Sequence, residues 1–174
     1  MLPAPTRSWL WGHYSALALL VASLTAIIDQ AHKWWTILVF HIEDKGRLAV
    51  LPFLDLVYTK NTGISYSLFE MSGPAGQRLL AGFAFAASLG LWVWIARGAE
   101  SRLMATSLAL ILGGAIGNGL DRLTLGGVAD FFLAHAFGYT WYVFNLADVA
   151  IVAGVIGLLY DSYVVSRKGA TKPL

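Results

Sequence analysis

Acidic residues stand at the edges of apolar segments in this sequence, and they are the side chains best suited to chemistry. The stretch "GGAIGNGLDRLTLGGVADFF", residues 113–132, carries Asp121 and Asp130 at the end of a glycine-rich apolar run, and "FNLADVAI", residues 144–151, carries Asp148 inside another. An ionisable side chain is costly within a bilayer, so its presence there indicates a functional site. Asp148 is the clearest candidate because its own run contains no other charged residue.

Two aspartates that meet at one membrane face could share a single proton. The neutral acid would polarise an amide carbonyl while the ionised partner activates water, and such a pair needs no cofactor. The sequence contains no cysteine and its four histidines are dispersed, so neither a thiol nucleophile nor a metal centre is expected. Spacing alone does not decide whether Asp121 or Asp130 is the partner of Asp148.

Three polar clusters have members three or four residues apart, which places each cluster on one face of a helix. They are Asp29 with Lys33, Asn118 with Asp121 and Arg122, and Asn145 with Asp148. Taken singly, the charged pairs have an ordinary structural explanation, either an interfacial ion pair or the locking of a helix end. A shared location at one membrane face would make them a site.

The composition identifies the elements that must position these residues. Of the 174 residues, 57% are hydrophobic and only 13% are charged, and the mean hydropathy is +0.65. This is too apolar for a soluble domain of this length, so we expect a membrane protein built of spanning helices. We expect no nucleic-acid partner because the net charge is only +2 and the twelve Lys and Arg residues are scattered.

Four apolar runs approach the length of about 20 residues that a spanning helix needs. They cover residues 9–28, 79–96, 103–120 and 143–160. The glycines of the third run predict close packing between helices. β-Branched and aromatic residues between the first two runs predict a small extramembrane β element within residues 37–70. We expect one domain over residues 1–174, an all-α polytopic membrane protein.

The distribution of Lys and Arg predicts that both termini face the cytoplasm. Arg97 and Arg102 lie between the second and third runs, and Arg167, Lys168 and Lys172 lie at the end of the chain. All three polar clusters would then lie at the outer membrane face. A small transporter or proton relay is the alternative to an enzyme. The lack of inverted repeats and the gathering of the acids at one face favour the enzyme.

Two further stretches are "DQAHK", residues 29–33, and "YTKNTGISYSLF", residues 58–69. Together with residues 113–132 and 144–151, in this order, they resemble the motif blocks of the lipoprotein signal peptidase family, also called signal peptidase II. The resemblance implies four transmembrane helices with a small periplasmic β cradle, in the bacterial inner membrane. It also implies a cofactor-free and metal-free aspartic endopeptidase, a monomer among membrane lipids, that cleaves prolipoproteins before the diacylglyceryl-modified cysteine.

The resemblance implies roles for individual residues and selects Asp130 over Asp121. Asp130 and Asp148 match the catalytic aspartates. Positions that line the pocket or orient the dyad are matched by Asn61, Asn118, Arg122 and Asn145, and supporting positions by Asp29, Lys33, Gly63 and Asp121. The chain departs from the usual family pattern at Ile64, Ser65, Tyr66, Gly119 and Ala129. These departures leave the dyad untouched.

Overall fold

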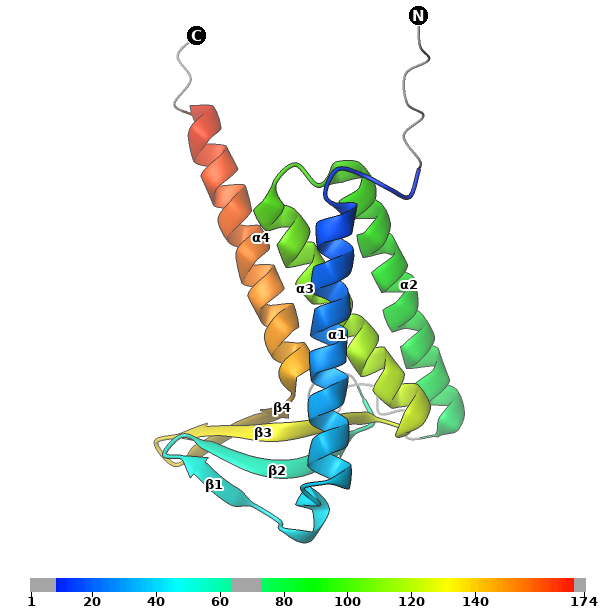
Figure 1. The fold of residues 1–174 in the computed structure, drawn as a ribbon. Coiled ribbons are helices and arrows are strands. Elements are labelled where there is room, and N and C mark those ends of the chain that lie inside the picture. The colour runs from blue at the N-terminus through cyan, green and yellow to red at the C-terminus, as the bar shows by residue number, and fades with distance from the viewer. Residues whose placement is uncertain (1–8, 64–72, 171–174) are drawn as a thin grey trace, which may run out of the picture.

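The computed structural model describes residues 9–63 and 73–170, and in it four long helices stand over a small sheet (Figure 1). The helices are α1 (Ser15–Leu38), α2 (Pro74–Gly98), α3 (Arg102–Thr124) and α4 (Leu146–Ala170). All four are long and apolar enough to cross a membrane, which confirms the four predicted spans. α1 begins and α4 ends at the same end of the bundle (Figure 1), so an even number of crossings is observed.

The bounds of the spans differ from the prediction where polar residues lie. The first span was expected at residues 9–28, but α1 runs on to Leu38. The helix continues through Asp29 because Lys33, one turn later, forms an ion pair with it at 2.8 Å. Asp121 was likewise expected beyond the third span, whereas it lies in the last turn of α3.

α3 is the central helix of the bundle and contacts the other three. Half of its apolar window is buried, against 11 to 22% for the others. Its glycines permit this contact. A Cβ on Gly113 would lie 2.6 Å from the carbonyl oxygen of Ala22 in α1, and one on Gly114 would lie 2.6 Å from that of Ala147 in α4. The predicted role of these glycines in helix packing is confirmed.

The extramembrane element is a four-stranded antiparallel sheet in the order β1-β2-β3-β4. Its strands are β1 (Leu48–Leu51), β2 (Leu54–Asn61), β3 (Val128–Ala136) and β4 (Tyr139–Phe144). β1 and β2 lie within the predicted range, residues 37–70, of which residues 64–70 fall outside the described part. The prediction missed β3 and β4. Residues 143 and 144 extended an apolar run, and periodicity cannot separate a short apolar strand from the start of a helix.

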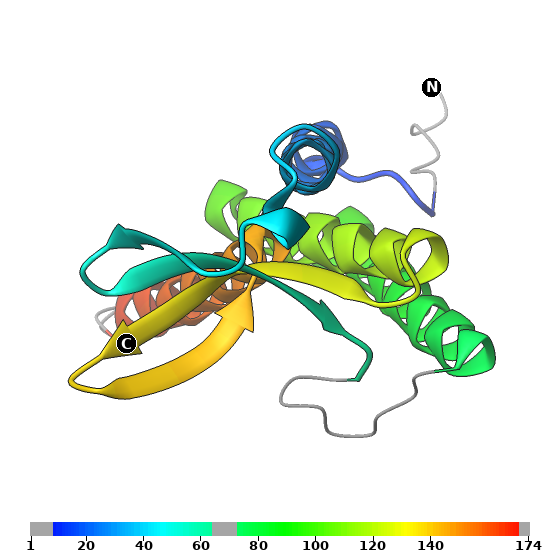
Figure 2. The ribbon, with the colours of Figure 1, turned by 90° about the horizontal axis from the view of Figure 1, so that it is seen from below.

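The sheet lies across one end of the helix bundle (Figure 2). A short 3₁₀ helix, η1 (Ile42–Asp44), follows α1, and Ile42 packs with Phe131 of β3 in a buried apolar cluster. Between α3 and β3 the chain turns sharply through Gly126, which has a φ of +71°. This short turn brings the start of β3 directly beneath the end of α3.

Candidate active site

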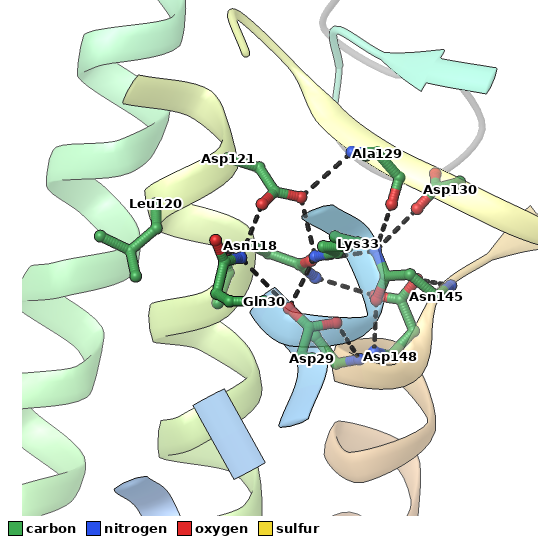
Figure 3. A network of polar contacts seen from close by, with 12 residues as sticks. Asp29, Gln30, Lys33, Asn118, Leu120, Asp121, Ala129, Asp130, Asn145 and Asp148 are labelled. Atoms are coloured by element: carbon green, nitrogen blue, oxygen red, sulfur yellow. Dashed lines mark hydrogen bonds and ion pairs between the residues drawn. The ribbon is translucent and has the colours of Figure 1, made fainter. Parts of the chain in front are cut away.

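The three polar clusters meet where α1, α3, β3 and α4 converge (Figure 3). Nζ of Lys33 in α1 lies 3.0 Å from Oδ1 of Asn118 in α3. The same oxygen accepts a hydrogen bond from Nδ2 of Asn145, just before α4, at 3.0 Å. The predicted convergence of the clusters is therefore confirmed.

Lys33 is a buried cation between two buried carboxylates. Its Nζ lies 2.8 Å from Asp29 and 2.7 Å from Asp121. Burying a charge is costly unless it is paired and hydrogen-bonded, and here the two acids meet that need. Asp121 therefore pairs with Lys33 of another helix and not with its neighbour Arg122. Arg122 instead donates to the backbone carbonyl of Asn118 at 3.2 Å.

The two carboxylates beside Lys33 also fix the backbone on either side of the site. Oδ1 of Asp29 accepts the N–H of Ala147, in the first turn of α4, at 2.9 Å. Oδ2 of Asp121 accepts the N–H of Ala129 in β3 at 3.1 Å. Gln30 donates to Asp121 at 2.7 Å and was not singled out from the sequence. In the sequence, the only sign of its role was an amide side chain directly after Asp29, at the end of an apolar run.

Asp148 and Asn145 cap the first turn of α4 reciprocally. Oδ1 of Asn145 accepts the N–H of Asp148 at 3.0 Å, and Oδ2 of Asp148 accepts the N–H of Asn145 at 3.2 Å. This is a capping box, and the positive end of the helix dipole favours a carboxylate there. Asn118 donates to the other oxygen of Asp148 at 3.0 Å. Asp148 is therefore held in one orientation, while its side chain remains partly exposed.

Asp130 is buried in β3, and Nδ2 of Asn145 donates to its Oδ1 at 2.7 Å. Burial, together with the charge of Asp148, raises the pKa of Asp130 to about 7. Hydrogen bonds from Asn145 and Asn61 act in the opposite direction. Asp130 thus keeps its proton far above the usual range of a carboxyl group. One amide, that of Asn145, contacts both aspartates (Figure 3).

The end of β2 forms another side of the site. Oδ1 of Asn61 accepts the N–H of Gly63 at 3.1 Å, and the carbonyl of Gly63 accepts a hydrogen bond from Arg122 at 3.0 Å. Gln77 of α2 donates to the carbonyl of Thr62 at 2.6 Å. Gln77 was also missed from the sequence, where it only marked the end of a polar loop. These contacts attach residues 61–63, at the end of β2, to α2 and α3.

An apolar groove of about 330 Å³ opens beside Asp148. Its walls come from β4 and from the first turns of α4. It is lined by Tyr142, Phe144, Asp148, Val149, Val152, Ala153 and Ile156. A polar site of paired carboxyls therefore borders a surface that an alkyl chain can cover.

The arrangement suits acid–base hydrolysis. Asp130 can hold a proton near neutral pH, and Asp148 is oriented by hydrogen bonds and partly exposed. Within residues 9–63 and 73–170, no group of three or more His, Asp or Glu residues could hold a metal ion.

Two of the departures from the family pattern can be examined in the structure. A Cβ on Gly119 would lie 3.3 Å from the ring of Phe85 in α2, so the glycine leaves space for this ring. Ala129 is a fully buried residue of β3. The remaining departures, Ile64, Ser65 and Tyr66, lie outside the described residues.

Comparison with known proteins places this site in a family. The family model described as signal peptidase (SPase) II matches residues 21–164. The lipoprotein signal peptidase of Methylocella silvestris is 49% identical over 155 residues, which cover 89% of this chain and 90% of the relative. That of Nitrobacter hamburgensis is 50% identical over 150 residues, covering 83% and 91% of the two chains.

Solved structures share the fold. A bacterial membrane enzyme determined at 2.3 Å superposes with a TM-score of 0.74 at 23% identity, covering 94% of this chain and 98% of the other. A second bacterial membrane enzyme, determined at 1.9 Å, superposes with a TM-score of 0.72 at 26% identity and covers 87% and 96%. Four spans and a small sheet are therefore the architecture of a bacterial membrane enzyme.

Proposed function

Since the chain belongs to the signal peptidase II family, we propose that it removes the signal peptide from prolipoproteins as an aspartic endopeptidase of the bacterial inner membrane. The bond cleaved is the one just before a diacylglyceryl-modified cysteine. The observation that carries the proposal is the pair Asp130 and Asp148, both hydrogen-bonded to Asn145, with the pKa of Asp130 raised to about 7.

In the proposed mechanism the two aspartates have different roles. Protonated Asp130 donates a hydrogen bond to the carbonyl oxygen of the scissile amide and polarises it. Ionised Asp148 removes a proton from a water molecule, whose oxygen forms a bond to the carbonyl carbon. The carbon–nitrogen bond then breaks, and the proton held by Asp148 passes to the departing amine. The products are a new carboxyl group on the signal peptide and a free amine on the lipidated cysteine.

The residues around the dyad are proposed to orient it. Asn118 and Asn145 would hold the carboxyl groups, and Asn61 with Arg122 would line the substrate side. Lys33 and its two acids would fix α1, α3 and the starts of β3 and α4 relative to one another. Gly63 would place its carbonyl against the guanidinium of Arg122. The network of hydrogen bonds between these residues supports this division of roles.

The apolar groove supports a lipidated substrate. The diacylglyceryl group is attached to the residue directly after the scissile bond, so its acyl chains must leave the dyad within a short distance. Val149, Val152 and Ile156 line the groove that begins at Asp148 and faces the lipid side of α4. Burial of an acyl chain contributes about 0.8 kcal/mol per methylene group. An unlipidated precursor would lose this contribution.

We propose that the protein consists of a single domain and acts as a monomer. We propose that its termini lie in the cytoplasm and its site at the outer face, because Arg97 and Arg102 lie at the end of the bundle where α1 begins. A transporter or proton relay with the same acids is the rival function. The acids gather at one end of the helices, where the bundle meets the sheet, and this favours the peptidase.

Incubation of the purified protein with a diacylglyceryl-modified preprolipoprotein tests the function. The expected product is shortened and begins at the lipidated cysteine, and the same precursor without its lipid should be cleaved much more slowly. The Asp130→Asn variant, at a matched amount of folded protein, serves as the control for contaminating proteases. Equal cleavage of both precursors, or no cleavage at all, would contradict the proposal.

A further inference from the structure

The far end of the sheet exposes a set of large apolar side chains. We call residues 50–53 and 136–142, the β1–β2 and β3–β4 turns with their flanks, the sheet tip. Its exposed side chains are Val50, Leu51, Phe53, Phe137, Tyr139, Trp141 and Tyr142. Phe137 is 100% exposed and Trp141 72%, and no residue of the sheet tip is charged. A patch of this kind indicates a surface that is covered by lipid or by a partner.

The conformation of the β3–β4 turn gives a second, independent indication. Ala136 pairs with Tyr139, so only Phe137 and Gly138 form the turn, with φ values of 51° and 81°. Two-residue turns with both φ positive strongly prefer Asn, Asp or Gly at the first position. A bulky side chain is strained there. Phe137 is therefore disfavoured both by its backbone conformation and by water, and a contact with lipid or with a partner would offset the cost of its exposure.

The position of the sheet tip identifies that contact. The β3–β4 turn is the outermost point of the sheet and lies level with the last turns of α1 (Figures 1 and 2). Trp34 and Trp35 are exposed on those turns, and Trp and Tyr residues gather where a bilayer meets water. From Ser15 to Trp35, α1 rises about 30 Å, the thickness of the hydrocarbon core. The sheet tip is thus at the depth of the membrane interface.

We propose that the sheet tip inserts into the boundary between head groups and acyl chains of the leaflet at this end of the bundle. This contact would be made by the sheet, in addition to the lipid-covered surface of the four helices. The charged residue of β2 nearest the tip supports this, because Asp55 is paired with Arg47 and His135 and presents no free carboxylate. The sheet is then held at two places, under the helices through Phe131 and at its tip through lipid.

Because the chain has no cysteine, single labels test the insertion directly. A nitroxide on Phe137→Cys is compared with one on Glu43→Cys in η1 and one on Ile156→Cys, which faces outward on α4. The three proteins are placed in vesicles of phosphatidylethanolamine and phosphatidylglycerol, and collisions with oxygen and with a water-soluble nickel chelate are measured. The label at position 137 should be reached by oxygen and protected from nickel, as at position 156 and unlike position 43.

Two results would overturn the proposal. Nickel access at position 137 equal to that at position 43 would place the sheet tip in water. Protection from both reagents would place it against protein, for instance a second copy of the chain. A matched pair of substitutions adds a second measurement, with the label on Thr140→Cys. Phe137→Asn suits the turn but not lipid and should raise nickel access there several-fold, whereas Phe137→Leu should not. Equal access in both variants would also count against insertion.

Discussion

Asn145 is the residue on which the site depends most directly. Its amide nitrogen contacts Asp130 at 2.7 Å, while its carbonyl oxygen and backbone N–H bind Asp148. One side chain therefore sets both the start of α4 and the spacing of the two carboxyl groups. Helical spacing in the sequence could select Asn145 and Asp148 as a pair. It could not relate them to Asp130, because that contact joins a strand to a helix end.

Substitution separates the three aspartates near the site. Asp130→Asn and Asp148→Asn should each lower turnover by about 100- to 10,000-fold, the range for loss of a general acid or base. Asp121→Asn should instead weaken the pairing of Lys33, with a loss of about 1.5–3 kcal/mol in the free energy of unfolding. The fraction that folds should still cleave. Cleavage is measured at matched amounts of folded protein, and an active Asp130→Asn beside an inactive Asp121→Asn would show that the wrong aspartate was chosen.

The raised pKa of Asp130 fixes a pH dependence with a definite sign. Cleavage needs the protonated form of Asp130, so activity should fall as pH rises through about 7. Protonation of Asp130 also contributes to the free energy of unfolding. This contribution is fully present below the usual pKa of 3.8 and is lost as pH rises through about 7, the pKa in the folded state. A hydrogen bond from Asn61 lowers this pKa. Asn61→Ala should therefore move the alkaline limb of the activity profile to higher pH, and a shift to lower pH would contradict the assignment.

At the scale of elements, the helices could be predicted and half of the sheet could not. Long apolar runs predict spans because lipid requires internally bonded backbone. The bounds of the helices differ from those of the runs, and α1 continues past Asp29 because that residue is in a buried ion pair. β3 follows α3 and pairs with β2, which is far away in the sequence, and β4 pairs only with β3, so local patterns carried little of their signal. Phe131 is buried only once the sheet has formed beneath α1. The position of Phe131 and of Asp130 depends on the register of the sheet and on long-range strand pairing, which residue spacing in the sequence does not reveal.

The packing of α3 against α4 gives a prediction at this scale. A Cβ on Gly114 would lie 2.6 Å from the carbonyl oxygen of Ala147, which is backbone in the first turn of α4. Gly114→Ala should push that turn away, lower the free energy of unfolding by about 1–3 kcal/mol and reduce cleavage. Gly90→Ala in α2 is the matched control because nothing lies within 4 Å of its Cβ. Thermal unfolding of both variants measures the difference, and equal stability would contradict this account of α3.

The whole molecule combines a frame embedded in lipid with a polar site at one of its ends. The four helices present apolar side chains to the bilayer, and the sheet covers the end at which the polar clusters meet (Figure 1). The apolar groove along α4 opens beside Asp148, which is partly exposed, whereas Asp130 is buried in β3. Which membrane face carries the site depends on the orientation of the frame, and only the distribution of basic residues indicates it.

Orientation is testable with reporters of compartment. Arg97 lies in the last turn of α2 and Arg102 begins α3, at the end of the bundle opposite the sheet, and positively charged loops remain in the cytoplasm. Fusions after Arg97 and after Lys168 should both report the cytoplasm, whereas a reporter inserted after Gly138, in the β3–β4 turn, should report the outside. An external signal at either of the first two positions would show that the protein has the opposite orientation in the membrane. The aspartates would then face the cytoplasm, where a signal peptide that has crossed the membrane could not present its cleavage site to them.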